Sequence, residues 1–217
     1  MVRDGRTVLD QVTFRLEKGT CTGIVDPGLG AHKTLMRILA TLTLPSAGRV
    51  SINGVDAIRD PVQARRHVSY ASHGAIEVQA RARLCVSEHL WLVARTRRAA
   101  SEERAREIAS RLALDLDGSI DRLTSEGRRA LAMATAFGLP SDVILVDMPS
   151  GAPTAPVRAV YAGLIRDAIR DGGTVVTAAD DFQYVDGICD TVLVFDGGRL
   201  GNRRTAATSP HESTCTR

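Results

Sequence analysis

A glycine-containing segment, DPGLGAHKT at residues 26–34, has residue types that could bind a phosphate. It lies between an apolar stretch and a run of hydrophobic residues with helical spacing. Backbone N–H groups of such a loop can surround phosphate oxygens, while a lysine contacts them and a hydroxyl holds Mg²⁺. The candidate nucleotide-binding residues of this segment are Pro27, Gly28, Gly30, His32, Lys33 and Thr34. The alternative is that the glycines only form a tight turn between a strand and a helix.

A second candidate is the acid at the end of a short apolar segment, VILVD at residues 143–147. A continuously apolar run of this length is typical of a strand buried on both faces of a parallel sheet. The carboxylate of Asp147 would then lie at the sheet edge, where it could help to hold Mg²⁺. The alternative is that it caps the turn that follows.

The rest of the chain predicts the elements that position these residues. Residues 8–25 alternate as paired strands do, with Val12, Phe14 and Leu16 on one face, and residues 49–54 predict a hairpin. A helix is predicted after the glycine loop, with Leu35, Ile38, Leu39 and Leu42 on one face. Further helices are predicted at 61–67, 87–98, 101–114, 126–138 and 157–169, and further strands at 174–178 and 192–195. This order predicts an α/β fold with a mainly parallel sheet flanked by helices, an antiparallel hairpin region and a helical subdomain.

Composition excludes several classes of protein. The chain has 217 residues, of which 44% are hydrophobic and 24% charged, so neither wholesale disorder nor a membrane domain is expected. A net charge of +3 and an aromatic content of 4% argue against nucleic acid as a partner. The amino terminus lacks the apolar stretch of a signal peptide, which favours a cytoplasmic location.

The cysteines and histidines do not predict a metal site. Four cysteines, Cys21, Cys85, Cys189 and Cys215, are far apart in sequence and form no CxxC pair, so neither zinc nor a disulfide is expected. The histidines have no metal-binding spacing, and we expect them to be solvated or hydrogen-bonded.

The chain resembles an ATP-binding-cassette (ABC) ATPase subunit, because several segments match that family in the same order and spacing. They are the glycine loop, LMRILATL, GRVSING, ARRHVSYASH, LTSEGRRALAMA and CDTVLVFDGGRL. The resemblance extends in particular to the cassettes of daunorubicin-resistance-type drug exporters of bacteria. It implies a P-loop NTPase-type fold with a single cassette at residues 1–203 and a helical subdomain at about residues 84–138. We expect residues 204–217 to be a disordered tail.

The phosphate loop departs from the family motif GxxxxGK[ST]. Aligned through LMRILA, His32 stands at the lysine position, Lys33 at the Mg²⁺ hydroxyl position and Ala31 at the preceding glycine. The alternative register, with Lys33 as the loop lysine, puts His32 where a glycine is required. Loss of a charge-assisted bond to phosphate costs about 1.5–3 kcal/mol, or ~10- to 150-fold in affinity. In an alternative arrangement, the Lys33 ammonium replaces the metal and binding is independent of Mg²⁺.

Other family positions are changed as well. His73 stands at the glutamine that senses the nucleotide's magnesium, and Glu126 brings a carboxylate into the signature loop that contacts the γ-phosphate across a dimer. Met148 replaces the catalytic glutamate and cannot accept a proton, which removes a contribution of ~10²- to 10⁴-fold to the rate. Thr154 replaces the D-loop aspartate, and Asp180 replaces the switch histidine. The adenine-stacking aromatic residue also has no counterpart near Met1.

The resemblance and these departures together predict a degenerate cassette subunit of an ABC-type exporter. ATP binding is expected to be weak or absent, a Mg²⁺ site is not supported apart from Asp147, and hydrolysis is expected to be lost or nearly lost. The implied partners are a membrane permease and a competent cassette in a heterodimer, at the inner face of the cell membrane. Three alternatives remain open: a regulatory scaffold without a transport role, an active ATPase with compensating changes, and a relic.

Overall fold

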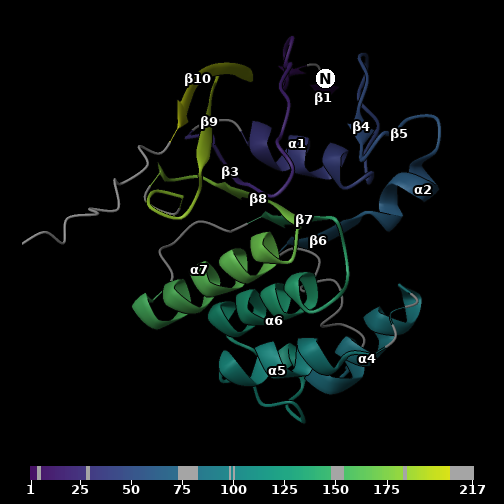
Figure 1. The fold of residues 1–217 in the computed structure, drawn as a ribbon, viewed down its shortest axis with the longest axis vertical. Helices are drawn as coiled ribbons and strands as arrows, with labels where there is room; N and C mark the ends of the chain where they lie inside the picture. The colour runs from purple at the N-terminus through teal and green to yellow at the C-terminus, as the bar shows by residue number, and fades with distance from the viewer. Residues whose placement is uncertain are drawn as a thin grey trace, which may run out of the picture.

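A six-stranded sheet forms the centre of the protein in the computed structural model (Figure 1). The structure describes residues 1–3, 6–27, 30–72, 83–97, 99, 101–147, 154–182 and 185–205. The sheet has the strand order β10-β9-β3-β8-β7-β6. All neighbouring strands are parallel except β10, which is antiparallel to β9. The strands are β3 (Cys21–Val25), β6 (Val68–Ser72), β7 (Val143–Asp147), β8 (Thr174–Ala179), β9 (Thr191–Asp196) and β10 (Arg199–Thr205).

The central strands are apolar because helices cover both faces of the sheet. Every residue of β3 and β8 is buried, as expected for parallel strands between two helical layers. Strand β7 has the bounds predicted from VILVD. These elements confirm the predicted α/β fold with a mainly parallel sheet.

Two groups of helices enclose the sheet (Figure 1). On one face, α1 (Ala31–Leu39) contacts β7 and β8, and α2 (Pro61–Arg66) contacts β6. On the opposite face lie α6 (Ser125–Phe137) and α7 (Ala155–Arg170). Helices α4 (Val86–Thr96) and α5 (Glu103–Arg111) pack against α6 and form the layer farthest from α1, and a short 3₁₀ helix (Ile120–Arg122) precedes α6.

The small hairpin next to α2 follows its predicted turn. Strands β4 (Ser51–Ile52) and β5 (Val55–Asp56) pair antiparallel, and Asn53 and Gly54 between them have φ of 52° and 85°. Positive φ at both central residues is the conformation that an Asn-Gly turn favours. A second antiparallel pair, β1 (Val2–Arg3) and β2 (Arg6–Thr7), lies near the amino terminus.

The prediction of paired strands across residues 8–25 was wrong for its first half. Only Cys21–Val25 forms a strand, and residues 8–17 join no described ladder. The alternation still governs burial, because Val12, Phe14 and Leu16 are half-buried against the apolar cluster around α1. An alternating pattern reports which side chains face the core, but pairing also needs an adjacent strand with a free edge.

Helix α1 is also shorter than its apolar pattern indicates. It ends at Leu39, and Thr41 adopts a positive φ of 57°. The chain therefore turns away before Leu42, whose side chain is 49% exposed, and the prediction that Leu42 shares the buried face was wrong. At the other end of the chain, β10 continues to Thr205, and residues 206–217 of the predicted tail lie outside the described residues.

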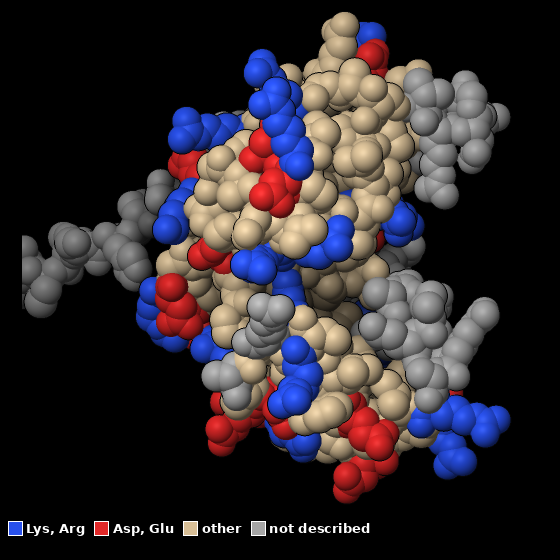
Figure 2. Space-filling model, turned by 90° about the vertical axis from the view of Figure 1, so that its right-hand side faces the viewer, with Lys and Arg blue, Asp and Glu red and all other residues tan. Residues whose placement is uncertain are grey.

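Among the described helices, none is both long enough and apolar enough to cross a bilayer. On the face shown in Figure 2, basic and acidic side chains are interspersed, with no continuous basic stripe.

Candidate functional site

Three carboxylates meet where three adjacent strands end. Asp26 follows β3, Asp147 is the last residue of β7 and Asp180 follows β8. The parallel register pairs Val25 with Ala179 and Asp147 with Ala178, so these ends lie at one edge of the sheet. In an open parallel sheet this edge is the usual location of a ligand site.

The N-terminus of α1 points at this edge and is filled by the chain's own acid. Gly30 precedes the helix with φ 69° and ψ 24°, a left-handed conformation that favours glycine. The Ala31 N–H donates to Asp26 Oδ2 at 2.6 Å, and the His32 N–H lies 3.4 Å from the same oxygen. Asp26 is only 3% exposed. Its carboxylate therefore takes the position at a helix N-terminus where a bound anion would be stabilised.

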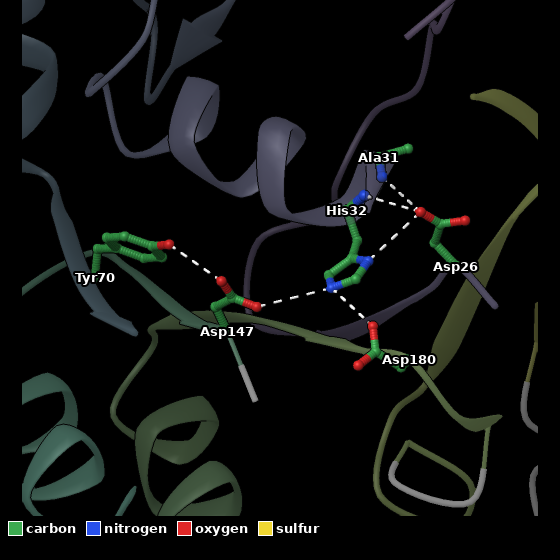
Figure 3. A network of polar contacts seen from close by, with 6 residues as sticks. All are labelled: Asp26, Ala31, His32, Tyr70, Asp147 and Asp180. Carbon is green, nitrogen blue, oxygen red and sulfur yellow. Dashed lines mark hydrogen bonds and ion pairs between the residues drawn. The ribbon is translucent and has the colours of Figure 1, made fainter. Parts of the chain in front are cut away.

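The imidazole of His32 lies between all three acids and has no exposed surface (Figure 3). Its Nδ1 is 3.5 Å from Asp26 Oδ2, and its Nε2 is 3.3 Å from Asp180 Oδ1 and 4.0 Å from Asp147 Oδ1. Neither ring nitrogen makes a hydrogen bond of good geometry within the described part of the chain. The ring is therefore buried among the acids without a hydrogen bond of good geometry, and the prediction of a solvated or hydrogen-bonded histidine was wrong for His32.

Asp147 is held on its other side by a tyrosine. The Tyr70 hydroxyl, on β6, donates to Asp147 Oδ2 at 3.3 Å (Figure 3). Burial raises the pKa of Asp147, while the nearby charges of His32 and Lys33 oppose that shift. Burial, together with the Asp147 charge, raises the pKa of Tyr70 to about 12. The ionised carboxylate thus depends on its basic neighbours to remain charged in a partly desolvated position.

The remaining loop candidates lie on different sides of α1. Lys33 is exposed, although its charge is near enough to Asp147 to oppose the rise in the pKa of that carboxyl. Thr34 is only 6% exposed and its N–H donates to the Gly30 carbonyl, while Pro27 is exposed. Gly28 lies outside the described residues, as do His73 and Met148.

These residues do not fit a magnesium nucleotide as they stand. The first N–H of α1 already has an acid acceptor, and three carboxylates at this edge repel phosphate oxygens. At the position that would supply a hydroxyl to Mg²⁺, the side chain is the cation Lys33. Within the described ranges, no group of three or more His, Cys, Asp or Glu side chains is arranged to hold a metal ion.

The N-terminus of α6 carries the second predicted phosphate-contact segment. Thr124 caps the helix by accepting a hydrogen bond from the Gly127 N–H at 3.1 Å. Glu126, in the first turn, is exposed and accepts a hydrogen bond from the hydroxyl of Thr154 at 2.9 Å. The two substituted positions, in the signature and D-loop segments, are therefore bonded to each other.

The sequence reasoning did not include Asp26 and Tyr70 in the site. For Asp26 a signal existed: counting back through GxxxxGK[ST] from His32 at the lysine position puts Asp26 at the first glycine. In the structure this acid accepts the first N–H of α1. No comparable signal identifies Tyr70, because its contact depends on the pairing of β6 with β7.

The fold is that of a nucleotide-binding cassette, and comparison with known families agrees. The family model described as "ABC transporter" matches residues 9–151. The chain therefore belongs to the ABC transporter family.

Curated relatives share low but extensive identity with the chain. The daunorubicin resistance ATP-binding protein DrrA3 of Streptomyces coeruleorubidus is 27% identical over 209 residues, which cover 93% of this chain and 64% of that protein. The methionine import ATP-binding protein MetN 2 of Salmonella typhi is 30% identical over 212 residues, which cover 88% of this chain and 59% of that protein. The chain thus spans less than two thirds of the length of these relatives.

Solved structures support the fold. The chain superposes on a dimeric bacterial ABC transporter cassette, MJ0796, with a TM-score of 0.77 at 19% identity, covering 91% of this chain and 90% of that one. A nucleotide-free ATP-binding cassette superposes with a TM-score of 0.74 at 15% identity, covering 94% of this chain and 88% of that one.

Proposed function

We propose that this chain is a degenerate cassette subunit of an ABC-type exporter that binds ATP weakly or not at all and does not hydrolyse it. The observation that carries the proposal is the Asp26 carboxylate at the N-terminus of α1. An incoming phosphate would have to displace this carboxylate from the helix N–H groups or lie beside it. Both alternatives weaken binding, because one loses a charge-assisted bond of the protein and the other adds a like-charge contact.

The loss of hydrolysis is supported by the residues around the same edge. Met148 follows Asp147 and has no group that could act as a general base. Asp180, at the switch-histidine position, has its carboxylate 3.3 Å from the buried His32 ring. By the same resemblance His32 stands at the lysine position. An acid, Asp180, therefore stands where the family has the basic switch histidine.

Partners are proposed from family membership. A cassette without its own catalytic base would depend on a competent cassette in a heterodimer and on a membrane permease, at the cytoplasmic face of the membrane. Export is the direction we propose, since the framework segments resemble drug-exporter cassettes, although relatives named for import match as well. The transported substrate is not encoded in the residues of this site.

A second candidate function, metal-independent nucleotide binding, has one observation in its favour. The charge of exposed Lys33 acts on Asp147, the residue that would otherwise hold Mg²⁺. A lysine ammonium in that position could neutralise phosphate oxygens without a metal. Such a subunit would sense ATP without turning it over.

Calorimetric titration of the full chain with ATP, with Mg²⁺ and with a chelator, tests both candidates. The reference is a variant that restores the motif, Asp26→Gly/Ala31→Gly/His32→Lys/Lys33→Ser. We expect the native chain to bind at least ~10-fold more weakly than the restored variant. Binding of MgATP equal to that of the restored variant, or ATP turnover by the native chain, would refute the proposal.

The single variant Lys33→Ala separates the two candidates. Saturable binding in the chelator that is lost in Lys33→Ala would establish metal-independent binding through this lysine. ATP binding in the chelator that is unchanged by Lys33→Ala would exclude metal-independent binding through this lysine.

A further inference from the structure

Two cysteines that are 168 residues apart in sequence are in direct contact inside the protein. Cys21 is the first residue of β3, and Cys189 lies in the segment just before β9. The Cys21 thiol donates to the Cys189 sulfur, and the two Sγ atoms are 3.2 Å apart. Cys21 is fully buried and Cys189 is 4% exposed, and both are free thiols.

We propose that Cys21 and Cys189 form a site of reversible oxidation, at which a two-electron oxidant such as a peroxide creates an internal disulfide. A disulfide needs the sulfurs to approach to about 2.05 Å, which from the present contact is a shift of about 1 Å. Hydrogen bonds already hold Asp190, the residue that follows Cys189, against Cys21. The Cys21 N–H donates to Asp190 Oδ2 at 2.8 Å, and the Asp190 N–H donates to the Cys21 carbonyl at 2.9 Å.

The reaction starts at the more accessible sulfur. Asp186, Gly187 and Asp190, in the turn around Cys189, are exposed, so an oxidant reaches Cys189 before Cys21. Peroxide transfers one oxygen atom to the Cys189 sulfur, giving a sulfenic acid and water. The Cys21 thiol then attacks that sulfur and releases a second water, so that two thiols and one peroxide give one disulfide and two waters.

The second step, in which Cys21 attacks, should be slow at neutral pH. The hydrogen bond to Cys189 and burial raise the pKa of the Cys21 thiol, and the charge of Asp190 adds to this effect. Because a thiolate is the better nucleophile, oxidation should be faster in alkaline solution.

The crosslink would fix the connection between β8 and β9 onto β3. This connection carries Asp180, which contacts His32, and Val185, which packs against Gly23 of β3. At Gly23 a Cβ atom would lie 2.8 Å from the Val185 Cβ, so the segment already rests directly on the strand. Oxidation would add a covalent bond to this contact, on the segment that positions one acid of the candidate site.

Peptide mapping of the native full chain after hydrogen peroxide treatment tests the proposal. Free thiols are alkylated after denaturation, and trypsin then releases Cys21 in residues 19–33 and Cys189 in residues 171–199. We expect these two peptides joined, with the loss of two hydrogens and with reversal by dithiothreitol. Cys21 and Cys189 that both remain alkylatable, or a preferred disulfide to Cys85 or Cys215, would overturn the proposal.

Thermal unfolding gives a second readout. Closing a loop of this length should raise the melting temperature by about 10 °C in the oxidised protein. The rise should be absent in Cys189→Ala and should persist in the matched control Cys85→Ala, whose half-buried thiol contacts Ser87 instead. A melting temperature that does not change on oxidation, or that changes equally in both variants, would contradict the proposed crosslink.

Discussion

The N-termini of α1 and α6 are both supplied with a carboxylate by the chain itself, but in different ways. At α1 the acid is Asp26, which comes from the end of β3 and is buried with His32. At α6 the acid is Glu126, which belongs to the helix's first turn, is exposed and lies beside a local threonine cap. At the exposed end of α6, water can replace the lost acceptor of a helix N–H. At the buried end of α1, water cannot take the place of Asp26. The two ends should therefore differ strongly in their response to substitution.

The largest effect should follow loss of the acid at α1. Asp26→Ala leaves the first N–H of α1 without its acceptor and removes one of the carboxylates around His32. We expect a loss of about 3–5 kcal/mol in the free energy of unfolding, measured by urea denaturation.

Asp190→Ala provides the matched control, since Asp190 also accepts a backbone N–H, that of Cys21 at the start of β3, but lies in an exposed position. We expect it to cost about 1 kcal/mol. Equal losses in the two variants would show that burial of Asp26 with His32 adds nothing to the free energy of unfolding.

An acid titration probes the packing of α4 against α6. His89 of α4 is 1% exposed, contacts the Thr135 hydroxyl of α6 at 3.2 Å, and burial lowers its pKa to about 4. The unfolded chain takes up a proton below about pH 6.5, but the folded protein does not until about pH 4. Stability from this group is therefore complete above pH 6.5 and is lost as the pH falls toward 4, by up to about 3 kcal/mol.

The unfolding free energy of His89→Gln, followed between pH 7 and pH 4, isolates this contribution. We expect a smaller loss on acidification than in the native chain. The acid sensitivity that remains belongs to other groups. Identical pH profiles would contradict the role given to His89.

Loss of the local cap at α6 should have a modest effect. Thr124→Ala removes the hydroxyl that accepts the Gly127 N–H and should cost about 1 kcal/mol, measured by the same urea denaturation. A loss as large as that of Asp26→Ala would show that the two helix ends do not differ as described.

The smallest effect is expected for the exposed acid itself. Glu126→Gln keeps an acceptor for the Thr154 hydroxyl and removes only the charge, so the unfolding free energy should change by less than about 0.5 kcal/mol. A change of several kcal/mol would mean that this carboxylate is as integral to the fold as Asp26.

The sequence was most informative where local chemistry decides the structure. The bounds of β7 follow from its apolar run, and Asn53-Gly54 forms the expected turn. Helix α2 starts at Pro61 because the preceding Asp60 caps it by accepting the Gln63 N–H. The sequence was least informative for residues 8–17, because their alternation records burial but they pair with no strand in the described part of the chain.

The site was predictable in position but not in charge arrangement. The strand-end acid Asp147 and the loop before α1 were identified from their patterns, and both lie at one edge of the sheet. The inward rotation of His32 among three acids was not, because it depends on the alignment of β3, β7 and β8. The contact between Cys21 and Cys189 has the same origin, since sequence spacing cannot show a pair formed by distant segments.

The central claim is that Asp26 occupies the position of a bound phosphate at α1. The most direct measurement is calorimetric titration of the native chain and of Asp26→Asn with inorganic tripolyphosphate, because asparagine keeps the shape and removes the charge. We predict no saturable binding to the native chain at millimolar concentration and an affinity at least ~10-fold higher in Asp26→Asn. Equal affinities, or tight binding to the native chain, would contradict the claim.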